Sequence, residues 1–269
     1  MKWMQVQPME GSQAQLTAYI HERELGRGEC VKRPAVLIFP GGGYNSISTR
    51  EMEPVALAFF ARGYQAFVLK YTVSCPQIKA PGMLPLKEAA ASVAWIRNQS
   101  DMLDVQADHI AVCGFSAGGH LAASLAVHFD SDRLEFGNIR PDAAILAYPV
   151  ISSKPQAQPQ LHESYKNLLG EGLEDAGYHN IEDHVSGQTP PSFVWHTFDD
   201  ELVVLENSLM YVRALNDHHV PTEYHVFGSG HHGLSMCGAE VGEDNPHCGR
   251  WLRTDACGAV FFTSAKGPL

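Results

Sequence analysis

Hydrophobic positions along the chain fall into two patterns, short runs and longer stretches with helical spacing. Runs typical of strands, most of them continuously apolar as in a sheet buried on both faces, occur at residues 34–40, 65–71, 108–115, 143–149, 193–196 and 222–227. Helical spacing occurs directly after the run at 108–115 and also at 51–62, 86–98, 202–215 and 251–262. A weak alternation at 14–20 indicates an outer strand. Strands that alternate with helices predict an α/β fold with a mostly parallel central sheet and helices on both faces.

Residues 150–190 interrupt this alternation. They are polar and rich in Pro, Gln, Gly and Asn, with a short helical piece near 162–169. A long connection between two core strands is often a functional loop. Because this one is too short for a separate cap domain, we expect a single domain over 1–269 with a minimal cap and a lid-like excursion at 150–190.

The strongest chemical motif lies where a strand is predicted to meet a helix. Gly114-Phe115-Ser116-Ala117-Gly118 has the pattern Gly-x-Ser-x-Gly, which forms a nucleophile elbow when a strand precedes it and a helix follows. The serine would lie at the helix N-terminus, where unpaired N–H groups and the helix dipole favour negative charge. The pattern also arises by chance in many proteins, but its context makes Ser116 the candidate nucleophile.

A glycine-rich loop follows the strand predicted at 34–40. Gly41, Gly42 and Gly43 stand directly after it, with Tyr44 next. Glycines allow the backbone to approach a ligand closely, with N–H groups pointing into a site. Such a loop joins the N–H of the residue after the nucleophile in binding an oxyanion. A flexible turn is the alternative interpretation.

Two later loops carry the partners that an activated serine needs. His196-Thr197-Phe198-Asp199-Asp200 follows the strand at 193–196, and Gly230-His231-His232-Gly233 follows the strand at 222–227. The order serine, acid, histidine is the one in which these loops supply a relay that removes the serine proton. For any single residue, a helix-capping aspartate or a solvated histidine is the alternative. The first loop offers Asp199 and Asp200 as candidates for the acid, and the second offers His231 and His232 as candidates for the base.

Together these motifs resemble those of α/β-hydrolase carboxylesterases and acetyl esterases, close to the bacterial group that includes acetyl xylan and sugar esterases. The resemblance covers nearly the whole length and implies the α/β-hydrolase fold. Relatives have a pattern similar to His-Thr-x-Asp-Asp-x-x-Val-Pro, which maps the acid onto Asp200, and Gly-Gly-His-Gly, which maps the base onto His232. Because Val204 replaces the proline and His231 replaces a glycine, Asp199 and His231 remain alternatives.

The resemblance implies a serine esterase in which Ser116 attacks the ester carbonyl, His232 carries the proton and Asp200 orients the histidine. The oxyanion would be bound by the N–H groups of Gly42, Gly43 and Ala117.

The expected substrates are short-chain acetyl esters of small carbohydrates such as xylo-oligosaccharides. Bulk from Tyr44 and Phe115 is expected to close the acyl side of the pocket, although core packing explains Phe115 equally well. A small-peptide or amide hydrolase of the same fold, and a catalytically silent binding module, are the alternatives. The intact set of motifs disfavours the silent module.

Charge and cysteine content narrow the possible partners. With 19 basic and 30 acidic residues the net charge is −11, which argues against nucleic acid or an anionic membrane surface as a partner. Six scattered cysteines without a C-x-x-C pair indicate free thiols in a reducing compartment. With no signal-like or membrane-spanning stretch, we expect a cytoplasmic enzyme. The His and Cys clusters lack metal-ligand spacing, so we expect neither metal nor cofactor; a homo-oligomer remains open.

Overall fold

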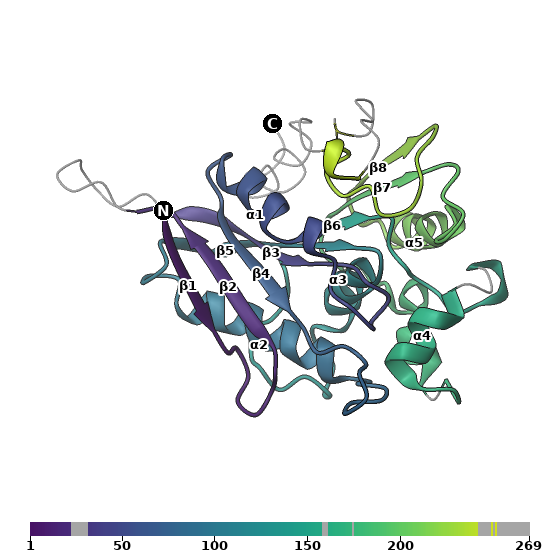
Figure 1. Cartoon of the computed structure of the whole chain (residues 1–269), viewed down its shortest axis with the longest axis horizontal. Helices are drawn as coiled ribbons and strands as arrows, with labels where there is room; N and C mark the ends of the chain where they lie inside the picture. The colour runs from purple at the N-terminus through teal and green to yellow at the C-terminus, as the bar shows by residue number, and fades with distance from the viewer. Residues whose placement is uncertain (23–31, 158–160, 174, 242–248, 250, 252–269) are drawn as a thin grey trace.

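The computed structural model describes residues 1–22, 32–157, 161–173, 175–241, 249 and 251. Within that part of the chain, strands form one sheet of order β1-β2-β4-β3-β5-β6-β7-β8 (Figure 1). The strands are β1 (Lys2–Val6), β2 (Gln15–Ile20), β3 (Arg33–Phe39), β4 (Gln65–Lys70), β5 (Val105–Phe115), β6 (Ala143–Ala147), β7 (Ser192–Thr197) and β8 (Thr222–Phe227). Strands β3 to β8 are parallel, whereas β1 and β2 pair antiparallel at one edge. The predicted mostly parallel sheet is confirmed.

Helices cover both faces of this sheet, as expected (Figure 1). Along β3, Val36 and Ile38 belong to the same apolar cluster as α1, whereas Leu37 and Phe39 belong to the cluster that contains α2, α3 and α5. The two faces of a strand therefore serve two separate cores. The helices are α1 (Glu53–Phe60), α2 (Leu84–Asn98), α3 (Ala117–His128), α4 (Leu161–Leu169) and α5 (Glu206–Asp217), with short 3-10 turns η1 (Thr49–Glu51), η2 (Pro155–Ala157), η3 (Ala176–His179), η4 (Ile181–His184) and η5 (Ala239–Val241).

Two details differ from the sequence-based expectations, and a third expectation falls outside the described residues. Strand β1 lies outside the predicted outer strand, and its mostly exposed side chains gave no apolar pattern. Helix α5 begins at Glu206 rather than at 202, because the Asp200 carboxylate accepts the N–H groups of Leu202 and Val203 and holds that stretch as a loop. The helix predicted at 251–262 lies, beyond Trp251, outside the described residues. That 1–269 form a single domain stays a prediction.

The cysteines do not all behave as expected. Cys75 and Cys113 are not disulfide-bonded, but Cys237 takes part in a disulfide. The expectation of free thiols is therefore wrong for Cys237, because a scattered spacing along the chain does not show which residues the fold brings together. Cys30, Cys248 and Cys257 lie outside the described residues. Over the described ranges, no helix is both long and apolar enough to span a membrane.

Buried histidines on α3 and η3 make the fold sensitive to acid. His120, His128 and His179 are all buried. Burial penalises the charged imidazolium, which lowers the pKa of His120 and of His128 to about 4 and that of His179 to about 3. In the unfolded chain an imidazole has a pKa of about 6.5. Between these values the unfolded chain binds protons that the folded chain does not, so stability falls as the pH is lowered from about 6.5.

We therefore expect the free energy of unfolding, measured by urea denaturation, to fall by on the order of 1 kcal/mol per pH unit for each of these histidines between pH about 6.5 and about 4.5. His128→Gln can still donate to the Tyr178 carbonyl, which His128 Nε2 contacts at 2.8 Å, and should reduce the pH dependence. The exposed His218 provides the control, since His218→Gln should leave it unchanged. A flat stability profile over this range would contradict the prediction.

Candidate active site

Ser116 stands at the sharp turn between β5 and α3. Its φ of 53° and ψ of −119° form a conformation that costs about 1–3 kcal/mol for a residue other than glycine. The flanking glycines leave room for the turn. A Cβ on Gly114 would lie 2.1 Å from the carbonyl oxygen of Gly118, and one on Gly118 would lie 2.1 Å from that of Phe39. The turn presents Ser116 to a cleft at the N-terminus of α3.

The glycine loop lies beside Ser116 at the end of β3. Gly42 and Gly43 have φ values of 125° and 61°, in the region that glycine adopts without strain. A Cβ on Gly42 would lie 2.2 Å from the Ser46 carbonyl oxygen. Both glycines line the same cleft as Ser116.

Some backbone N–H groups near Ser116 donate hydrogen bonds within the protein, and others are available to a substrate oxygen. The N–H of Gly41 donates to the carboxylate of Glu51 at 2.7 Å, so it is not available to a substrate oxygen. Within the described ranges, no protein acceptor is found for the N–H groups of Gly42, Gly43 and Ala117. These are the three groups predicted to bind an oxyanion.

His232 connects the serine to a carboxylate. Its Nε2 lies 2.8 Å from Ser116 Oγ, and its Nδ1 lies 2.7 Å from Asp200 Oδ2. Because an ionised carboxylate only accepts hydrogen bonds, Nδ1 carries the proton and Nε2 accepts the serine O–H. The structure thus brings together the three residues predicted as nucleophile, base and acid, which follow β5, β8 and β7.

The Asp200 carboxylate is 3% exposed and has partners at both oxygens. Oδ1 accepts the N–H groups of Leu202 and Val203 at 3.0 and 2.9 Å, and Oδ2 lies 3.3 Å from His196 Nε2 as well as close to His232. Burial alone would raise the pKa of Asp200, but the hydrogen bonds from His196 and His232 outweigh it and hold the pKa well below its ordinary value. The carboxylate is therefore ionised and fixed in orientation.

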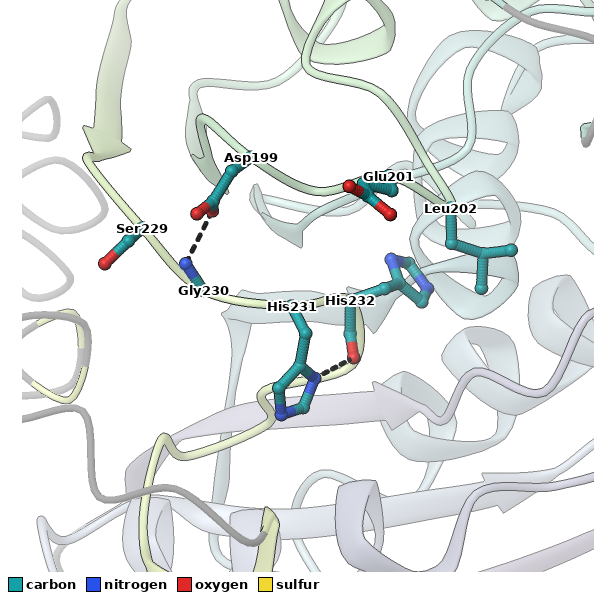
Figure 2. A pocket seen from close by; sticks show the side chains of 7 residues that line it. All are labelled: Asp199, Glu201, Leu202, Ser229, Gly230, His231 and His232. Carbon is teal, nitrogen blue, oxygen red and sulfur yellow. Dashed lines mark hydrogen bonds between the residues drawn. The ribbon is translucent and has the colours of Figure 1, made fainter.

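The neighbours of Asp200 and His232 face elsewhere, as Figure 2 shows. Asp199 Oδ1 accepts the N–H of Gly230 at 2.6 Å, which ties the acid loop to the base loop. The exposed ring of His231 bonds through Nδ1 to the carbonyl oxygen of His232 at 2.7 Å. The two imidazole rings point in different directions (Figure 2). The geometry therefore favours Asp200 and His232 over Asp199 and His231.

The cleft above Ser116 has a volume of about 770 Å³. Most of the side chains that line it are polar, and they come from the glycine loop, α4 and the acid and base loops. These residues include Asn45, Ser46, Ser48, Thr49, Arg50, Glu163, Ser164, Asn167 and Glu240, with Ile47, Leu202 and Val203 as the larger apolar contributions. A neighbouring pocket of about 570 Å³ lies along the base loop at Asp199 and His231 (Figure 2).

The excursion at 150–190 forms one wall of the cleft. Its helix α4 supplies three lining residues, and Asn167 Nδ2 donates to the carbonyl oxygen of Gly43 at 2.9 Å. The excursion is therefore bonded to the glycine loop.

Two predicted substrate-binding residues are corrected by the structure. Tyr44 is 2% exposed, and its hydroxyl lies 2.7 Å from His120 Nδ1. Because His120 Nε2 donates to the His179 carbonyl oxygen at 3.0 Å, Nδ1 accepts the Tyr44 O–H. Phe115 is fully buried and packs against Tyr148 and Trp251. Neither side chain lines the cleft, since each is drawn into the core behind it.

Sequence reasoning missed several residues that shape the site. In the sequence His196 is distinguished only as part of the acid motif, yet it contacts the Asp200 carboxylate. Glu51 and Tyr148 had no motif at all and appeared only within a predicted helix and a predicted strand. A glutamate at the start of an apolar helix gives no sign that it is buried.

The family comparison agrees with this geometry. The BD-FAE family model matches residues 25–215. Endo-1,4-beta-xylanase B from Butyrivibrio fibrisolvens is 36% identical over 84% of this chain and 35% of its own length. The acetylxylan esterase from Xylanibacter ruminicola is 27% identical over 84% of this chain and 45% of its own length. The chain thus spans less than half the length of either curated relative.

A solved structure matches along almost its entire length. The acetyl ester-xyloside bifunctional hydrolase from Caldicellulosiruptor lactoaceticus is 33% identical, with a TM-score of 0.81 over 95% of each chain. The resemblance to α/β-hydrolase esterases predicted from the motifs is confirmed, and the chain belongs to the BD-FAE family.

Proposed function

We propose that this chain is a serine esterase that removes acetyl groups from small carbohydrates such as xylo-oligosaccharides. The observation that carries the proposal is the hydrogen-bonded series Ser116, His232 and Asp200 at a polar cleft. This is the arrangement that makes a serine nucleophilic. The names of the relatives from Xylanibacter ruminicola and Caldicellulosiruptor lactoaceticus support ester hydrolysis on acetylated or xylose-containing compounds.

In the proposed acylation, His232 Nε2 takes the proton of Ser116 as Oγ bonds to the ester carbonyl carbon. Asp200 stabilises the imidazolium that forms. The carbonyl oxygen becomes negative and accepts hydrogen bonds from the N–H groups of Gly42, Gly43 and Ala117. When the tetrahedral intermediate collapses, the bond to the alcohol oxygen breaks and His232 gives its proton to that oxygen.

Water completes the cycle. His232 takes a proton from a water molecule as the water oxygen attacks the acetyl carbonyl carbon on Ser116. The N–H groups of Gly42, Gly43 and Ala117 bind the second oxyanion. The bond to Ser116 Oγ then breaks, Oγ recovers the proton from His232, and acetic acid leaves and ionises in water to acetate. Every step uses side chains and backbone of this chain.

The lining of the cleft supports a small carbohydrate as the alcohol part of the ester. Hydroxyl and amide groups of Asn45, Ser46, Ser164 and Asn167 can donate to and accept from sugar hydroxyls. Only a few side chains of the lining are large and apolar, so a long acyl chain would remain in contact with polar groups or water.

An amide hydrolase is the second candidate, because the same histidine could protonate an amine leaving group. The silent binding module is disfavoured by the hydrogen-bonded series at Ser116.

The cytoplasm is the compartment we propose for this reaction. The absence of a disulfide at Cys75 and Cys113 supports it, whereas the disulfide at Cys237 counts against it. Fractionation of the source cells, with ester hydrolysis assayed in each fraction, tests this part of the proposal.

Substrate preference provides the test of the proposed function. We expect hydrolysis of p-nitrophenyl acetate to be fastest, butyrate slower and octanoate poor, with discrimination of on the order of 1 kcal/mol per added methylene. Acetylated xylo-oligosaccharides should lose acetyl groups, as followed by mass spectrometry. The Ser116→Ala variant is the control for background hydrolysis. An optimum at octanoate, or cleavage of peptide amides without loss of acetyl from any sugar ester, would overturn the proposal.

A further inference from the structure

A buried carboxylate that the proposed reaction does not use lies beneath the glycine loop. Glu51 is the last residue of η1 and is 2% exposed. Its Oε2 accepts the N–H of Gly41 at 2.7 Å, and its Oε1 accepts the hydroxyl of Tyr148 at 2.8 Å. Both partners donate, as an ionised carboxylate requires. Burying a charge is unfavourable unless such donors are provided. One donor here lies on the glycine loop, and the other contacts the loop that carries His232.

The first side is the oxyanion-binding loop. A Cβ on Gly41 would lie 2.9 Å from Glu51 Oε2 and 3.0 Å from the Cβ of Ser116, so Gly41 fits between the carboxylate and the nucleophile. The bond from the Gly41 N–H holds the Pro40–Gly41 peptide, which directly precedes the peptide that carries the Gly42 N–H. Glu51 is therefore bonded to the chain immediately before the two glycines whose N–H groups lie beside the serine.

The second side is the loop that carries the base. The ring of Tyr148 packs edge-on against His232, with 5.1 Å between ring centroids. Its hydroxyl oxygen also accepts the N–H of Ser235 at 2.8 Å. Burial, with the nearby Glu51 charge, raises the pKa of Tyr148 well above its ordinary value, so the hydroxyl keeps the proton that it donates to Glu51. The carboxylate is thus bonded, through one side chain, to the base loop.

The residue before Glu51 strengthens this second connection. Arg50 Nε donates to the carbonyl oxygen of Gly233 at 2.9 Å, and the carbonyl of Arg50 accepts the Ser235 hydroxyl at 2.8 Å. These bonds join positions more than 180 residues apart in the chain. Residues 50 and 51 therefore hold the segment after His232 at two points.

We propose that Glu51 is a positioning residue, which fixes the oxyanion-binding loop through Gly41 and the base loop through Tyr148 in the arrangement that the transition state needs. The inference rests on the proposed esterase function. Glu51 reaches the cleft lining, but both of its carboxylate oxygens are bonded to Gly41 and Tyr148, so it acts through the two loops.

The test measures kcat and KM on p-nitrophenyl acetate for variants of Glu51. We expect Glu51→Ala to lower kcat by about 100-fold, similar to the loss of one oxyanion donor, with KM nearly unchanged because the misplaced groups act in the transition state. Glu51→Gln keeps one oxygen that accepts a hydrogen bond, so it should recover part of kcat. The exposed Glu53 gives a matched control, and Glu53→Ala should behave like the parent.

A second variant separates positioning from general loss of structure. Tyr148→Phe retains the ring beside His232 but removes the link to Glu51, so it should also lower kcat. If the two residues act together, the loss in Glu51→Gln/Tyr148→Phe is smaller than the product of the single losses. Circular dichroism and the thermal midpoint report folding. If Glu51→Ala does not fold, the kcat values of Glu51→Gln and Tyr148→Phe, each relative to the parent, test the positioning role.

The possible outcomes distinguish failure of the positioning role of Glu51 from failure of the proposed esterase function. Parent-like kcat in Glu51→Gln and in Glu51→Ala, or a raised KM with unchanged kcat, overturns the positioning role. Multiplicative losses in the double variant overturn the coupling through Tyr148. A parent protein that hydrolyses no ester indicates failure of the proposed function instead.

Discussion

Replacing Ser116 with alanine is expected to lower kcat for ester hydrolysis by about a thousandfold or more. The reason is that His232 then has no hydroxyl to deprotonate, so no acyl-enzyme forms. The fold should persist, because the backbone bonds of this residue do not involve its side chain: its N–H donates to the Ala147 carbonyl, and its carbonyl accepts from His120 and Val150. Steady-state kinetics together with the thermal midpoint check both parts.

A serine in the same cleft offers the matched control. Ser164 lines the cleft from α4 and makes no contact with His232 among the hydrogen bonds of the described residues. Ser164→Ala should therefore keep most of kcat on p-nitrophenyl acetate, which lacks the sugar hydroxyls that Ser164 is proposed to contact. A reactive phosphonate should add to Ser116 of the parent and not to the alanine variant, as mass spectrometry of peptides would show. Near-parent hydrolysis by Ser116→Ala, or labelling of another serine, would exclude it as the nucleophile.

The second large effect is expected at Asp200 and His232 but not at their neighbours. His232→Ala removes the group that accepts the serine proton, and we expect losses in kcat comparable to those of the serine variant. In Asp200→Asn, the N–H groups of Leu202 and Val203 that now bond Oδ1 would hold the amide oxygen. The amide NH₂ would then face His232 Nδ1 and favour the tautomer whose Nε2 cannot accept the serine proton. A loss in kcat of about 10⁴-fold follows by analogy with serine proteases.

The neighbouring residues act as internal controls. In Asp199→Asn an amide oxygen can still accept the Gly230 N–H, and the exposed His231 contacts only the backbone of His232, so Asp199→Asn and His231→Ala should keep most of the activity. Measured kcat values for all four single variants, with thermal midpoints to verify folding, check the assignment. A reversed pattern would move the acid or the base by one residue.

Much of the fold follows from patterns that are local in the sequence. Buried strands such as 34–40 and helices such as 86–98 were predictable because the side-chain period of each element is set by its own backbone geometry. The elbow at Ser116 was predictable for the same reason, since Gly114 and Gly118 relieve contacts within a few residues of the turn. Parallel strands then place the loops after β3, β5, β7 and β8 at one edge of the sheet.

The direction of individual side chains was not predictable in this way. Asp199 and Asp200 are chemically identical neighbours, and only contacts with a loop about 30 residues further along the chain distinguish them. Tyr44 and Phe115 looked suitable for an acyl pocket, yet His120 and the aromatic residues behind the sheet draw them into the core.

By itself, then, the sequence determined the α/β layers, the elbow and the order in which nucleophile, acid and base occur, because these depend on short-range periodicity and on glycine at defined positions. Only the tertiary structure decided which aspartate and which histidine meet Ser116, that Tyr44 is buried, and that Glu51 joins Gly41 to Tyr148. Those outcomes depend on hydrogen bonds between segments up to 116 residues apart, whose partners become neighbours only when the sheet has formed.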